Sequence, residues 1–160
     1  MAVDVNVRKS LKAKVDEAFK VFTEQKSQEE IYAKLPGTDV RIKREGRAPN
    51  VRLKVSRKMP ASAPGPIKRL VPPVNEVTHT EEWKADGDGY SAKIAVDIKG
   101  VPVQFKGTKT VKPDKGGCVV EWKFVVTSGV PLLGGIVAAC GAEQLQGNLE
   151  DEYRVVKDMF

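Results

Sequence analysis

Apolar and polar residues alternate along most of the chain, the pattern of strands that bury one face only. In the first such segment, residues 2–8, Val3, Val5 and Val7 share one face. Further alternating rows follow at residues 40–42, 51–55, 76–84, 90–98, 101–111 and 118–126. The pattern predicts an antiparallel sheet of about seven strands with one buried and one solvated face.

Three segments carry apolar residues at helical spacing instead. The first follows Ser10, a predicted N-cap. The second begins at Ser27, which pairs with Glu30 in a predicted capping box, and it ends at Pro36. The third runs from residue 131 to the C-terminus, which is roughly 40 Å of helix. This long helix is the main element that can cover the apolar face of the sheet.

The predicted last helix has little bulk in its first half, where Gly134, Gly135 and Gly141 lie among alanines. Each glycine inside a helix costs about 0.5–1 kcal/mol relative to alanine. Two explanations are open. The missing side chains leave a cavity beside Gly141, or they let the helix lie directly on the sheet.

Residues 57–75 interrupt the strands with five of the ten prolines. We predict a loop with one helical turn at residues 67–70. Long loops in compact domains often border binding sites, although a tolerated insertion would have the same composition. No repeat or linker divides the chain, so residues 1–160 are predicted to form a single domain.

Composition and charge limit the compartment and the partners. The chain is 41% hydrophobic and 30% charged. It lacks an apolar run long enough for a membrane span or a signal peptide, and has only two cysteines, so we expect a cytoplasmic protein. The net charge is +6, with 17 Lys/Arg against 8 Asp/Glu in residues 1–70. The basic residues 40–69 suit transient contact with an anionic membrane, or simply keep strands soluble. Without interleaved aromatics they argue against nucleic acid.

His79 and Glu81 are the candidates for acid–base chemistry. With Val77 and Trp83 they fall on one face of a strand. If that face is buried, Glu81 would have a raised pKa and His79 could move a proton; if not, both are solvated and inert. One histidine and two distant cysteines do not match a metal site, and phosphate loops are absent, so we predict no metal and no cofactor.

The order of elements resembles the START-like (SRPBCC) superfamily, which includes polyketide cyclases and the birch-pollen-allergen (Bet v 1-like) group. Within it, TEEW at residues 80–83, VPVQFKGTKTV and VPLLGGIVA are similar to an uncharacterised bacterial family of unknown function. The chain lacks the glycine-rich loop of the pollen-allergen relatives, because REGRAPN holds only Gly46. The resemblance implies an α+β helix-grip fold, in which a curved antiparallel sheet of about seven strands wraps a long C-terminal helix and two short helices follow the first strand.

The resemblance also implies a cavity between the sheet and the last helix, holding an apolar ligand. We therefore expect a protein that binds a hydrophobic small molecule or lipid, with residues 59–72 controlling access. The expected lining residues are Val55, Trp83, Tyr90, Ile94, Phe105, Val120, Trp122, Val137, Gly141 and Leu145. The alternatives are an enzyme of the cyclase or dehydratase type that uses His79 and Glu81, and a structural protein with a filled interior.

Overall fold

The computed structural model describes residues 2–61 and 63–160. Within them the chain forms one antiparallel sheet, three α-helices and one 3₁₀ helix. The elements are β1 (Ala2–Leu11), α1 (Val15–Thr23), α2 (Gln25–Lys34), β2 (Thr38–Arg47), β3 (Asn50–Pro60), the 3₁₀ helix η1 (Gly65–Leu70), β4 (Val74–Asp86), β5 (Gly89–Ile98), β6 (Gln104–Asp114), β7 (Gly117–Thr127) and α3 (Gly134–Lys157). This order confirms the predicted helix-grip architecture.

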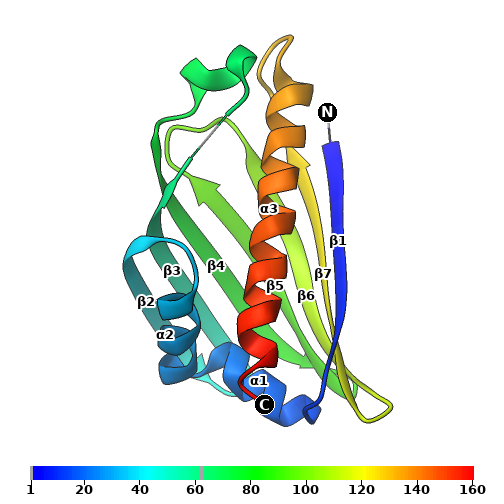
Figure 1. The fold of residues 1–160 in the computed structure, drawn as a ribbon. Helices are drawn as coiled ribbons and strands as arrows, with labels where there is room; N and C mark the ends of the chain where they lie inside the picture. Colours follow the sequence, from blue (N-terminus) through cyan, green and yellow to red (C-terminus); the bar gives the residue numbers. More distant parts are fainter. Residues whose placement is uncertain (1, 62) are drawn as a thin grey trace.

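The seven strands of the described chain are ordered β1-β7-β6-β5-β4-β3-β2, so β1 and β2 are the two edges. Helix α3 lies along the concave face, with α1 and α2 near its C-terminal end and η1 near its N-terminal end (Figure 1). The α3 backbone comes closest to β1 and β7. The side of the sheet formed by β3, β4 and β5 is therefore farther from the helix than the β1 side.

Both short helices begin at other residues than predicted. Ser10 is not an N-cap, because β1 continues to Leu11 and Ser10 pairs with Val119 in β7. Helix α1 begins at Val15. Ser27 does not start α2, because α2 begins at Gln25, directly after α1 ends. Pairing with β7 extends β1 to Leu11, beyond the residues that alternate between apolar and polar. Only Glu24 separates α1 from α2.

The turns follow the glycine signals more closely. Strands β4 and β5 are joined across Gly87, and β6 and β7 across Gly116, both of which have positive φ. In contrast, the chain after Gly100 does not return directly to a strand, and β6 begins only at Gln104. The predicted helical turn in the proline-rich loop is η1, which is anchored in the core by Ile67, 1% exposed.

The end of the sheet beneath α1 is sealed by aromatic side chains. Phe19 packs edge-on against Trp83 and stacks on Tyr90, while Phe22 lies parallel to Trp83. Such pairs add to the stability gained by burying their large apolar surfaces. None of the described helices is long and apolar enough to cross a membrane.

Candidate functional site

A cavity of about 230 Å³ lies between α3 and the inner face of β3, β4, β5 and β6. We call it the α3 cavity. It is lined by Arg57, Met59, Pro60, Asn75, Val77, Val96, Ile98, Phe105, Gly141, Gln144, Leu145 and Asn148. Its floor is mostly apolar, and its polar groups come from β3, β4 and α3.

Gly141 packs closely against the sheet and also lines the α3 cavity. A Cβ atom at Gly141 would lie 3.1 Å from Cζ of Phe105 and 3.2 Å from Cγ2 of Val103, which is tighter than ordinary contact. Both open explanations for Gly141 therefore describe part of the structure, because the glycine is closely packed on one side and still lines the α3 cavity. The glycine lets α3 lie against the Phe105 ring, and the α3 cavity extends beside that contact.

Two further hollows continue around the first half of α3. A cavity of about 30 Å³ shares Asn75, Phe105, Gly141 and Gln144 with the α3 cavity and is closed by Ile67. An open surface hollow lies between residues 63–64 and Cys140 on α3. The predicted access segment 59–72 thus borders all three hollows, except for Ser62, which lies outside the described residues.

Two polar side chains of the α3 cavity, Asn75 and Arg57, can form further hydrogen bonds or ion pairs with a ligand. Asn75 is only 5% exposed, and its Oδ1 atom has no hydrogen-bond partner among the described residues. Arg57 donates from Nη1 to the carbonyl of Pro36 at 3.0 Å, and its guanidinium lies 5.1 Å from the centre of the Tyr32 ring. None of the ion pairs between described residues includes Arg57.

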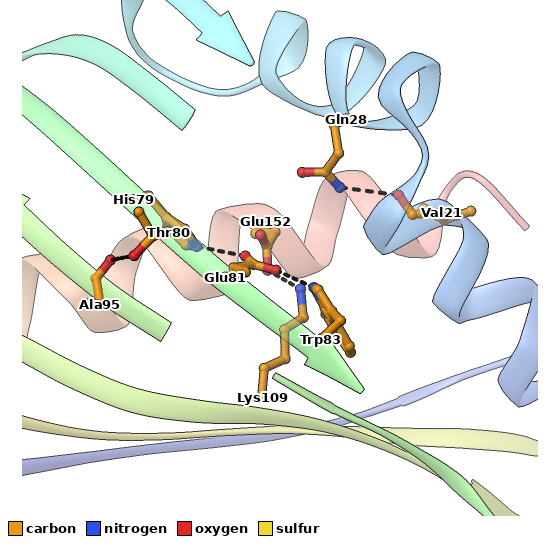
Figure 2. A network of polar contacts seen from close by, with 9 residues as sticks. All are labelled: Val21, Gln28, His79, Thr80, Glu81, Trp83, Ala95, Lys109 and Glu152. Atoms are coloured by element: carbon orange, nitrogen blue, oxygen red, sulfur yellow. Dashed lines mark hydrogen bonds and ion pairs between the residues drawn. The ribbon is translucent and has the colours of Figure 1, made fainter. Parts of the chain in front are cut away.

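A buried cluster of charges lies on the same inner face, nearer α1 and α2. Glu81 is 4% exposed; its Oε2 lies 2.6 Å from Nε2 of His79, and its Oε1 accepts a hydrogen bond of 2.8 Å from the Trp83 indole. Figure 2 shows these groups converging between β4 and α3. The inner face therefore carries a fully buried carboxylate.

Lys109 of β6 supplies the positive charge. Its side chain is buried, its Nζ lies 3.3 Å from Oε2 of Glu152 on α3, and it sits 3.5 Å from the centre of the Phe22 ring. In Figure 2 the Lys109 ammonium points toward both Glu81 and Glu152. The residues His79, Glu81, Lys109 and Glu152 form what we call the charge network.

The charge network sets the protonation of Glu81. Burial by itself raises the pKa of this carboxyl, but Lys109, His79 and the two hydrogen bonds lower it to about 2. The expectation of a raised pKa is therefore wrong, and Glu81 is ionised at neutral pH with no proton to donate. Burial also raises the pKa of Tyr32, helped by Glu152 and Glu81, so its hydroxyl stays neutral.

The structure separates the expected lining residues into groups. Phe105, Gly141 and Leu145 line the α3 cavity, and Val137 lines the smaller one. The others pack in the core without lining the α3 cavity: Val55, Trp83, Ile94, Val120 and Trp122. Tyr90 borders a separate hollow, where its hydroxyl donates to Asp16 at 2.6 Å.

His79 and Glu81 are inward on β4, on the face that also carries Asn75 and Val77. Only Asn75 and Val77 belong to the wall of the α3 cavity. Among the described residues, no group of three His, Cys, Asp or Glu side chains is arranged to hold a metal ion.

Sequence reasoning missed Arg57, Asn75 and Lys109, although the two-residue period of a strand marks all three. Arg57 continues the inward row of Val55 on β3, and Lys109 lies between Phe105 and Val111 on β6. Asn75 precedes Val77 by two positions. Polar residues on an otherwise apolar face were the available signal.

Several solved structures share the fold over nearly the whole chain. TTHA0849 from Thermus thermophilus is 16% identical, with a TM-score of 0.64, covering 98% of this chain and 95% of that one. The di-domain ARO/CYC StfQ from the steffimycin biosynthetic pathway is 17% identical, with a TM-score of 0.65, covering 99% of this chain and 50% of that one. Norcoclaurine synthase from Thalictrum flavum is 16% identical, with a TM-score of 0.60, covering 99% and 86%.

At these identities the likenesses show the fold alone, which is the helix-grip fold that the sequence predicted. No curated protein matches the chain. Residues 6–159 match a family described as "Protein of unknown function (DUF2505)". Because this match covers most of the chain, the protein belongs to the DUF2505 family.

Proposed function

We propose that this protein binds a small, largely apolar molecule in the α3 cavity. The observation that carries the proposal is the cavity itself, which lies between the small-residue half of α3 and an apolar sheet floor that includes Val77, Val96 and Ile98. Removing the apolar surface of a ligand from water at this floor supplies the affinity.

The size of the cavity narrows the ligand class. Small-molecule sites commonly measure about 300–1,000 Å³, and 230 Å³ lies below that range. At about 30 Å³ for each water in the liquid, this volume equals roughly eight water molecules. A molecule with one or two rings suits the cavity better than a lipid with long chains.

The comparisons support a small ligand. Norcoclaurine synthase, which shares the fold, was solved with dopamine and hydroxybenzaldehyde, and StfQ belongs to a biosynthetic pathway. The enzymatic alternative through His79 and Glu81 has less support, because Glu81 is held as a carboxylate and neither residue lines the α3 cavity.

Access to the α3 cavity is proposed to pass beneath residues 63–72. Ile67 anchors this segment in the core, and the flanking residues Met59 and Pro60 form part of the cavity wall. A segment held at one buried point can shift its exposed parts without unfolding the sheet.

Native mass spectrometry of the protein purified from cells, followed by organic extraction, tests the proposal. The wild-type protein should carry a small co-purified molecule. Val96→Phe should exclude it by filling the α3 cavity, whereas Val125→Phe should retain it, because Val125 is 44% exposed on the opposite face. Equal occupancy in both variants would contradict the proposal.

A further inference from the structure

The two polar residues with unmet capacity in the α3 cavity lie next to each other on the inner face. Arg57 pairs with Val77 across β3 and β4, and Asn75 pairs with Met59. Arg57 and Asn75 are therefore diagonal neighbours in the antiparallel ladder, and the Cα atoms of such neighbours lie about 7–8 Å apart. Two groups of one small ligand can reach both side chains.

Asn75 presents an acceptor that the protein leaves unpaired. The residue is only 5% exposed, and Oδ1 has no partner among the described residues while the side chain borders both inner cavities. An unpaired buried polar group is costly, and such groups are rare in native proteins. A ligand hydroxyl or N–H would satisfy this acceptor.

The positively charged guanidinium of Arg57 is contacted by Pro36 and Tyr32. Its Nη1 donates to the carbonyl of Pro36, and the guanidinium lies over the Tyr32 ring, so these two contacts orient the long side chain. No described carboxylate forms an ion pair with it. A guanidinium offers a fork of N–H donors that matches a carboxylate.

We infer that the ligand of the α3 cavity is a small ring-containing carboxylic acid with a separate hydrogen-bond donor. The carboxylate pairs with Arg57, the donor bonds to Oδ1 of Asn75, and the ring packs on Val77, Val96 and Phe105. The inference rests on the proposed function, since it concerns the same cavity, and it adds the polar chemistry that selects among apolar molecules.

Four probes separate the two polar contacts: p-hydroxycinnamate, cinnamate, methyl p-hydroxycinnamate and methyl cinnamate. Titration calorimetry should show that wild-type protein binds each acid about tenfold or more tightly than its ester, because a charged hydrogen bond is lost in the ester. Each hydroxylated probe should bind about fivefold more tightly than its partner without the hydroxyl.

Each variant should remove one preference only. Arg57→Met should abolish the preference for acid over ester and keep the preference for the hydroxylated probes. Asn75→Leu should abolish the preference for the hydroxylated probes and keep the preference for acid over ester. Asn75→Leu should also raise the Tm of the ligand-free protein, because it removes an unpaired buried acceptor. Arg52→Met, an exposed arginine on the same strand, is the control that should keep both preferences.

The outcomes separate this inference from the proposed function. Equal binding of acids and esters by the wild-type protein, or an unchanged hydroxyl preference in Asn75→Leu, would overturn the assigned chemistry. If no probe binds while Val96→Phe still excludes a co-purified molecule, the ligand class is wrong and the proposed function stands. If the probes bind Val96→Phe as tightly as wild type, they occupy another place, and both conclusions fail.

Discussion

Replacing Lys109 by methionine tests the charge network most directly. Methionine keeps most of the length of the side chain and its apolar stem, and it removes the ammonium, which lies close to the rings of Phe22, Trp83 and Trp122. It leaves Glu81 and Glu152 facing a buried region without their cation. Removing one partner of a buried ion pair costs about 3–5 kcal/mol of unfolding free energy.

The pKa of Glu81 gives a second value for the loss of unfolding free energy in Lys109→Met. In the folded protein the pKa falls from 4.5 to about 2, which corresponds to roughly 3 kcal/mol. Because the pKa is lower in the folded state, this stabilisation is present above about pH 4.5 and is lost as the pH falls toward 2. Without Lys109, burial is opposed only by His79 and the two hydrogen bonds, so the pKa of Glu81 should rise. The defect of the variant should therefore be largest at neutral pH and shrink on acidification.

Urea denaturation of both proteins at pH 7 and pH 4 measures the effect. Lys109→Met should lose about 3–5 kcal/mol at pH 7 and less at pH 4. Lys106→Met, on the exposed face of the same strand, should change stability by less than about 0.5 kcal/mol. A loss below about 1 kcal/mol at pH 7, or one that does not depend on pH, would refute the assigned role of Lys109.

Two further predictions concern α3 and the loop. Gly147→Ala should raise the free energy of unfolding by about 0.5–1 kcal/mol, because nothing lies within 4 Å of the added Cβ, whereas Gly141→Ala should give less or lose stability, because Phe105 must shift. Thermal denaturation compares the two, and an equal gain in both would mean that Gly141 is not closely packed. Ile67→Ala should cost about 2–5 kcal/mol and speed hydrogen exchange across residues 63–72; unchanged exchange there would show that Ile67 does not anchor the segment.

The fold was predictable because its strands alternate so regularly. Val3, Val5 and Val7 mark the inward face of β1, and glycine-containing turns mark the hairpins around Gly87 and Gly116. Helix boundaries were less predictable. Ser10 has the chemistry of an N-cap, yet pairing with Val119 keeps it in the sheet. Long-range strand pairing overrode the local preference of a single residue.

The candidate site was only partly predictable. The alternation of side chains along a strand shows which face of the sheet a residue lies on, but not where along the sheet it lies. Trp122 and Phe105 both face inward, yet only Phe105 reaches the α3 cavity. The pKa of Glu81 was also out of reach, because its direction depends on Lys109, which is 28 positions away in the sequence. Side chains on separate strands meet only through the register of the ladder.

The charge network and the α3 cavity are connected through the position of α3. An apolar cluster of similar volume would often be as stable as a buried ion pair, so stability alone does not explain the network. Lys109 holds Glu152, which is 11 residues along α3 from Gly141, or roughly 16 Å on the same helix. A slip of one turn, about 5.4 Å, would remove Gly141 from Phe105 and Leu145 from the cavity wall. We therefore expect Lys109→Met to weaken binding of the co-purified ligand although Lys109 lies outside the wall; unchanged affinity would leave the network with a role in stability only.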